Sequence, residues 1–136
     1  MNKSSTKKYR KKKIGMSNLV QYVIVRKDLL TSLSWPVGAI IAQACHATVA
    51  VTHMFYNDEN MIKYLEDIDN MRKVVLSISS EQKLVSLSSQ LVASNVDHKL
   101  WVEQPEDIPT CLVTKPYPKD DVQHHFKKLK LFKYEP

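Results

Sequence analysis

The chain has 136 residues, a net charge of +6 and a hydrophobic fraction of 43%, which together predict one folded domain with a core of its own. No apolar run approaches the roughly 20 residues that span a bilayer, and no secretory signal is recognisable. Two cysteines without an export signal predict reduced thiols in the cytoplasm, or in the nucleus if the basic start of the chain acts as a nuclear address.

The positive charge is concentrated at the N-terminus. The first 13 residues hold seven Lys or Arg and no acid, which leaves 13 basic against 14 acidic side chains in the rest of the chain. We therefore expect a basic, disordered tail over residues 1–17 and a nearly neutral folded domain over residues 18–136. Such a tail is either a solvated segment or an arm that attracts RNA, because clustered cations attract any polyanion.

After the tail, the hydrophobic pattern predicts strands and helices in alternation. Residues 19–25 are rich in β-branched and aromatic side chains, which indicates a buried strand. A helix is expected from Pro36 to about Phe55, because proline suits the first turn of a helix. Capping residues at 57–59 then start a short helix that runs to about Ile68.

The second half of the chain continues this alternation. Residues 72–79 form the second expected strand, and Ser80 is the expected N-cap of a third helix. The third and fourth strands are expected at 97–104 and 110–114, with a turn at 105–107 between them.

A final helix is expected from 119 to 129, with an apolar stripe made of Val122, Phe126 and Leu129. The complete order is then β-α-α-β-α-β-β-α. This order predicts an α/β domain, and the short hairpin at 104–110 predicts that its sheet is mixed rather than all parallel.

The helix expected at 36–55 contains no Asp, Glu, Lys or Arg. Its predicted core stripe consists of Val37, Ile40, Ile41, Ala44, Thr48, Val51 and Phe55. Gln43, His46 and His53 fall on another face at helical spacing. That face is either an ordinary solvent face or the wall of a cleft, and an uncharged helix favours packing on both sides or a cleft.

Several common kinds of site find no support in the sequence. The cysteines and histidines match no zinc signature, so no metal site is expected. The two glycines cannot form a phosphate-binding loop, and no nucleophile elbow is present. The strand ends suggest instead a cluster suited to an ester or amide substrate, consisting of Asp28, Gln43, His46, Glu103 and Thr110.

Several segments of the chain resemble type 2 peptidyl-tRNA hydrolases. They are residues 25–29 (VRKDL), 38–47 (GAIIAQACHA) and 72–76 (RKVVL). Segments 34–38, 100–106 and 115–119 resemble one branch, the peptidyl-tRNA hydrolase domain-containing proteins. The likeness extends over about residues 19–132. It implies a four-stranded mixed sheet with helices on both faces, and hydrolysis of the ester that joins a peptide to the ribose of tRNA, without a metal or other cofactor.

The resemblance also implies roles for individual residues. Glu103 would orient or activate water, while Gln43 and Thr110 would position the ester. His46 would line the cleft or tie the helix to neighbouring backbone. The expected substrate and RNA contacts are Lys27, Asp28, Arg72 and Lys115, together with the tail. The expected partner is tRNA, with no membrane partner, and a homodimer remains open.

The chain departs from the family pattern at several positions. Ala39 stands where the family motif carries a lysine, Glu103 replaces an aspartate, and Leu112 replaces a threonine. The turn after Glu103 is shorter and lacks a further threonine. Two hypotheses follow. One is a peptidyl-tRNA hydrolase with an altered site, and the other is a catalytically inactive module that binds tRNA or a protein on the same fold.

Overall fold

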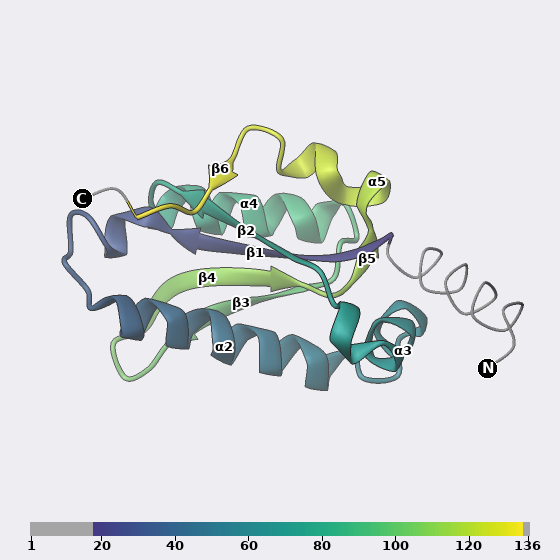
Figure 1. Ribbon diagram of the computed structural model, residues 1–136. Coiled ribbons are helices and arrows are strands. Elements are labelled where there is room, and N and C mark those ends of the chain that lie inside the picture. The colour runs from purple at the N-terminus through teal and green to yellow at the C-terminus, as the bar shows by residue number, and fades with distance from the viewer. Residues whose placement is uncertain (1–17, 135–136) are drawn as a thin grey trace, which may run out of the picture.

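The computed structural model describes residues 18–134, so the expected tail at 1–17 lies outside the described residues. The chain forms an α/β domain with one mixed sheet (Figure 1), as predicted. Its elements are β1 (Leu19–Arg26), the 3₁₀ helix η1 (Lys27–Leu29), α2 (Val37–Met54), α3 (Glu59–Glu66), the 3₁₀ helix η2 (Ile68–Asn70), β2 (Lys73–Ile78), α4 (Glu81–Ala93), β3 (His98–Glu103), β4 (Ile108–Thr114), β5 (Tyr117–Pro118), α5 (Lys119–Val122), the 3₁₀ helix η3 (Gln123–His125) and β6 (Lys130–Leu131).

Over the described residues, the sheet has six strands in the order β3-β4-β1-β2-β6, with β5 paired to the start of β1. Strands β1 and β2 are parallel, and all other pairs are antiparallel. The expectation of four strands was wrong because β5 and β6 have only two residues each. Such short strands produce no alternating pattern in the sequence, and they exist only because folding brings them to the free edges of β1 and β2.

The sheet lies between α2 on one face and α4 with α5 on the other (Figure 1). All eight residues of β1 are buried, because this strand lies at the centre of the sheet between both helical layers. The core on the α4 side is formed by Val20, Tyr22, Ile24, Leu76, Ile78, Leu84, Leu87, Leu91, Val96, Leu112, Val122 and Phe126. The core on the α2 side is formed by Val23, Val25, Leu29, Ile40, Ala47, Val51, Cys111 and Val113.

The row of α2 residues that faces the sheet differs from the predicted stripe. The buried residues of α2 are Ile40, Gln43, Ala47 and Val51. Val37 and Ile41 were predicted to lie in the core, but their side chains are 52% and 58% exposed. The prediction failed because α2 has no strongly polar face, so the apolar period fits two adjacent helical rows equally well. Gln43 therefore points towards the sheet.

Helix α2 is also the one helix among residues 18–134 whose length and apolar composition would suffice to cross a membrane. Only 22% of this helix is buried within the structure. One such helix is weak support for a membrane span, because a helix that packs on a sheet can have the same composition.

The predicted last helix is shorter than expected. Only the first turn is α-helical, and the chain leaves the helix after η3 because it must reach the edge of β2, where β6 pairs. The three predicted apolar anchors are nevertheless correct. Val122 and Phe126 are each 2% exposed, and Leu129 packs against the same core. Ser80 is also the N-cap of α4, since its side chain accepts a hydrogen bond from the Lys83 backbone.

Candidate active site

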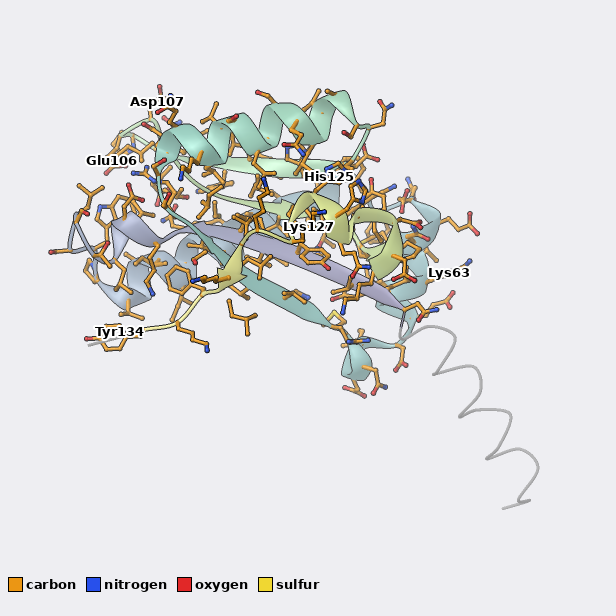
Figure 2. All side chains as sticks on the ribbon, turned by 90° about the horizontal axis from the view of Figure 1, so that it is seen from above. Lys63, Glu106, Asp107, His125, Lys127 and Tyr134 are labelled. Carbon is orange, nitrogen blue, oxygen red and sulfur yellow. The ribbon has the colours of Figure 1, made fainter. Side chains whose placement is uncertain are left out.

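The candidate site lies where the carboxyl ends of β1 and β3 meet the first half of α2. In the antiparallel ladders Val25 stands opposite Cys111, and Glu103 stands opposite Ile108. Both strand ends therefore lie at one end of the sheet. The β3–β4 turn and the connection from β1 to α2 lie at this same end (Figure 1). Figure 2 shows Glu106 and Asp107 of this turn far from Lys63 of α3, which lies at the opposite end.

Gln43 of α2 connects two strands through its side-chain amide. Its Nε2 donates a hydrogen bond of 2.5 Å to Glu103 Oε2, and its Oε1 accepts a hydrogen bond of 3.0 Å from the Thr110 hydroxyl. The carboxylate can only accept, so it fixes the orientation of the amide. Gln43 is 2% exposed and Thr110 is fully buried. The result is a chain of hydrogen bonds that runs from the buried core to the carboxylate.

Thr110 reaches Gln43 because β4 contains a bulge. Trp101 pairs with Cys111, but Val102 pairs with Pro109, which leaves Thr110 as the extra residue of β4. In a regular strand, Thr110 and Cys111 would point to opposite faces of the sheet. The bulge turns both towards α2, where the Cys111 thiol donates to the Gln43 backbone carbonyl at 3.4 Å. Burial raises the pKa of Cys111 to about 12, so this thiol stays protonated and structural.

The environment of Glu103 favours the ionised carboxylate. The hydrogen bond from Gln43 has the largest effect and lowers the pKa of Glu103, desolvation opposes it as the second-largest effect, and the Gln104 backbone N–H and the nearby His46 lower the pKa further. A carboxylate with a lowered pKa is charged at neutral pH and orients a water molecule well, but it is a weak proton acceptor. Glu103 is half-buried, so solvent reaches its oxygens.

His46 and Trp101 lie beside this carboxylate. Their rings stack with centroids 5.0 Å apart and planes 26° apart. Trp101 and Glu103 both point to the α2 face of β3, two residues apart. The buried indole Nε1 of Trp101 faces Glu103 and helps to lower its pKa, although its geometry falls short of a hydrogen bond. His46 is exposed and thus lines the site.

Asp28 and Lys27 lie at this end of the sheet but outside the hydrogen-bonded cluster. Asp28 accepts two hydrogen bonds from Arg26, at 3.0 Å from Nε and 2.8 Å from Nη2. Arg26 also donates to the Pro109 carbonyl at 2.9 Å. Lys27 places its Nζ 4.8 Å from the ring centroid of Phe132, near the C-terminus.

Arg72 and Lys115 lie at the opposite end of the sheet. Arg72 precedes β2, whose first residue pairs with Gln21 near the start of β1. Lys115 follows β4 and is 9% exposed, and its ammonium contacts Asp58 at 2.5 Å and Asp97 at 3.3 Å. The structure therefore brings together the four predicted catalytic residues, but not these two predicted contacts.

The sequence of the folded domain is similar to sequences of known proteins. The family described as "Peptidyl-tRNA hydrolase PTH2" matches residues 19–132. The chain belongs to the PTH2 family. Two curated relatives, from Mus musculus and Homo sapiens, both carry the name "Putative peptidyl-tRNA hydrolase PTRHD1". Each is 47% identical over 116 residues, which cover 85% of this chain and 83% of the relative. The predicted family is confirmed.

Two positions at which this chain differs from the PTH2 pattern can now be placed relative to the site. Ala39 stands where the PTH2 resemblance expects a lysine, four residues before Gln43 and therefore on the same side of α2. None of the lysines within residues 18–134 forms an ion pair with Glu103. Leu112 is fully buried in the α4-side core, on the opposite face of the sheet. Of these two positions, Ala39 lies on the side of α2 that carries Gln43, whereas Leu112 lies away from the candidate site.

Sequence reasoning did not include two features of this PTH2 domain. Trp101 is the first, since a single tryptophan within an expected strand gives no signal that it belongs to a site. The C-terminal segment 122–134 carries exposed lysines and no acid, which is a charge run that the sequence does display. Figure 2 shows Lys127 and His125 on this segment above the sheet. The lysines are Lys127, Lys128, Lys130 and Lys133.

An open apolar groove of about 490 Å³ lies on the other flank of α2, over β1 and β2, and does not include Glu103. It is lined mainly by Val25, Ile41, Cys45, Val49, Val75 and Phe132. Within residues 18–134, no three His, Cys, Asp or Glu side chains are grouped so that they could hold a metal ion.

Proposed function

We propose that this protein hydrolyses the ester between the peptide and the ribose of peptidyl-tRNA, with Glu103 as the residue that orients the attacking water. The hydrogen bond from Gln43 to Glu103 is the observation that carries the proposal. It fixes an ionised, solvent-accessible carboxylate at the end of a strand, where ligands of open α/β sheets bind.

In this reaction the water oxygen forms a bond to the ester carbonyl carbon. The bond between that carbon and the ribose oxygen then breaks, and the proton lost by water ends on the ribose hydroxyl. Glu103 accepts a hydrogen bond from the water and orients it for attack, and the proton moves to the ribose oxygen as the carbon–oxygen bond breaks. Gln43 and Thr110 are buried, so we assign them the role of positioning residues that act through Glu103. His46 lines the cleft.

The RNA backbone would lie along the lysines at the edge of β2 and at the end of the sheet that carries Glu103. The C-terminal lysines follow the β2 edge, and the chain then reaches Phe132, where Lys27 lies at the site end. Phosphates bind such a series of lysines without sequence preference. Arg72 and the basic tail would extend this contact, and we propose the cytoplasm, where tRNA is recycled, as its location.

The second candidate function is a module that binds tRNA without hydrolysing it. The absence of a lysine at Ala39 favours this candidate, because an oriented cation beside a developing oxyanion contributes several kcal/mol to transition-state stabilisation. Both candidates require RNA binding, and only the first requires release of tRNA.

The deciding experiment follows release of tRNA from N-blocked aminoacyl-tRNA by the purified protein. We expect release by the wild type, and at least about a hundredfold slower release by Glu103→Gln, since the neutral amide cannot orient water in the same way. The matched control is Glu106→Gln, in the exposed turn beside the site. No release by the wild type at micromolar protein, with RNA binding intact, would leave the binding module as the function.

We also propose that two copies associate through the exposed flank of α2. Ile41 and Val49 are 58% and 70% exposed there, next to the apolar groove, and α2 has no Asp, Glu, Lys or Arg. A neutral apolar surface is complementary to itself, as a two-fold interface requires. Sedimentation at rising concentration should show a dimer that Val49→Lys dissociates. A wild type that stays monomeric at high micromolar concentration would contradict this proposal.

A further inference from the structure

We propose that the stacked rings of His46 and Trp101 form a platform for the terminal adenine of tRNA. This inference rests on the proposed function and identifies the part of the substrate that meets these two side chains. Trp101 would act as the buried base of the platform, and His46 as its exposed layer.

The first observation is the geometry of the two rings. With their centroids 5.0 Å apart and their planes 26° apart, imidazole and indole form an offset stack. His46 is exposed, whereas Trp101 is half-buried against the α2-side core. The imidazole therefore covers the indole and presents its remaining surface to solvent.

The second observation is that the His46 ring is held by no contact in the described chain other than its stack on Trp101 and its charge interaction with Glu103. Within residues 18–134, its ring nitrogens form no hydrogen bond, and Trp101 is its one ring contact. Its two ring nitrogens are thus available to the polar edge of a base or to a ribose hydroxyl. Trp101 lies on β3, which is an edge strand, so no strand of the part of the chain that the structure describes closes this side of the platform.

The third observation is that both rings lie next to the residues proposed to act on the ester. His46 follows Gln43 by three residues on α2, and Trp101 precedes Glu103 by two residues on β3. Each element therefore places one ring beside one member of the Gln43–Glu103 pair.

The chemistry of the substrate matches this arrangement. The ester of peptidyl-tRNA is carried by the ribose of a terminal adenosine, so the adenine is one sugar ring away from the bond that Glu103 would attack. Proteins bind the unpaired bases of single-stranded RNA by stacking them on Trp, His and other flat side chains. An exposed imidazole–indole stack beside the carboxylate is therefore a suitable receptor for this base.

The test measures binding of a CCA trinucleotide whose 3′ end carries an N-acetylated amino acid through an amide, which resists hydrolysis. The chain has two tryptophans, so the full-length Trp35→Phe protein leaves Trp101 as the single indole fluorophore. We expect CCA to quench Trp101 emission. His46→Ala should weaken binding about tenfold, and His46→Phe should retain it, because phenyl keeps the stack. His53→Ala, at an exposed histidine of the same helix, should have no effect.

Two further ligands identify the base and its source. CCU, with a pyrimidine at the end, is expected to bind more weakly than CCA. We expect 5′-AMP to bind more weakly than CCA as well. If AMP bound as tightly as CCA, the ligand would be a free nucleotide and the proposal would be overturned. Unchanged binding by His46→Ala, or binding by His46→Phe as weak as that of His46→Ala, would also overturn it.

Failure of the platform is distinguishable from failure of the proposed hydrolase. If the wild type releases tRNA and His46→Ala does so with unchanged KM, the platform is wrong and the hydrolase stands. If the wild type releases no tRNA but His46→Ala still weakens CCA binding, the platform stands on a non-hydrolytic module.

Discussion

Gln43 and Glu103 are 60 residues apart in the chain and are joined by a hydrogen bond of 2.5 Å. The other end of the Gln43 amide is held by the Thr110 hydroxyl, so the amide cannot turn its oxygen towards the carboxylate without losing both bonds. The charge state of the solvent-accessible Glu103 is therefore controlled by a side chain that is almost fully buried.

Replacement of Gln43 by leucine should raise the pKa of Glu103. Loss of the Nε2 donor removes the main stabilisation of the ionised form, so protonation occurs at a higher pH. The acid limb of the pH profile of kcat/KM for tRNA release should shift to higher pH, and NMR titration of the Glu103 carboxyl should shift in the same direction. Gln90→Leu on α4 is the control. An unchanged acid limb would show that the bond does not control Glu103.

Replacement of Thr110 by valine should lower the free energy of unfolding by about 1–3 kcal/mol. The substitution preserves shape but leaves the buried Oε1 of Gln43 without its donor. Urea denaturation measures the change, and Thr110→Ser should restore much of the stability because it keeps the hydroxyl. Equal stability of the valine and serine variants would contradict this reading of the buried chain.

Replacement of Ala39 by lysine should increase the rate of tRNA release at least about tenfold. Ala39 lies one helical turn before Gln43, so a lysine there can place a cation beside the oxyanion that forms during ester hydrolysis. Ser86→Lys, at an exposed position of α4, adds the same charge far from the site. Equal rates of tRNA release by the two variants would contradict the prediction, because they would show that a cation at position 39 does not restore faster hydrolysis.

Replacement of Asp58 by asparagine should flatten the dependence of stability on acidic pH. Burial opposes ionisation of Asp58, but the bond from Lys115 and the backbone N–H groups of Met61 and Asn60 outweigh it and lower its pKa. A carboxyl with a lowered folded-state pKa stabilises the protein above its usual value of 3.8, and this stabilisation is lost as the pH falls through the folded-state pKa.

The free energy of unfolding of the wild type should therefore decrease more steeply below about pH 5 than that of Asp58→Asn. Asparagine is also a good N-cap, so the start of α3 is preserved and the comparison isolates the charge. Asp69→Asn, at an exposed position, should retain the wild-type slope. Parallel curves for Asp58→Asn and the wild type would contradict the assigned role of the Lys115 ion pair.

Replacement of Asp28 by alanine should cost about 3 kcal/mol of stability, because it leaves the buried guanidinium of Arg26 without its charged partner. Affinity for tRNA should change little, since Asp28 is held by Arg26. Thermal unfolding and an RNA-binding titration measure the two effects, with the exposed Asp120→Ala as control. Weaker RNA binding at unchanged stability would identify Asp28 as an RNA contact, as the sequence predicts.

The sequence alone was sufficient for features that arise from local patterns. The β-branched run at 19–25, the capping serine at position 80 and the anchors Val122 and Phe126 predicted elements that the structure contains, because each depends on residues close together in the chain. Motifs in a matching order also predicted the family. The expected strand ends also placed Gln43, His46, Glu103 and Thr110 in one candidate site, together with Asp28, which the structure leaves outside the hydrogen-bonded cluster.

Only the tertiary structure decided how those residues meet. The uncharged helix α2 fits the sheet through either of two rows, and packing against β4 selects the row that buries Gln43 and exposes Ile41. A bulge, which depends on the pairing of β3 with β4, turns Thr110 towards Gln43. Lys115 is bound by Asp58 and Asp97 because strand pairing brings them together. These contacts join residues far apart in the chain, so they depend on register and packing, which local periodicity does not encode.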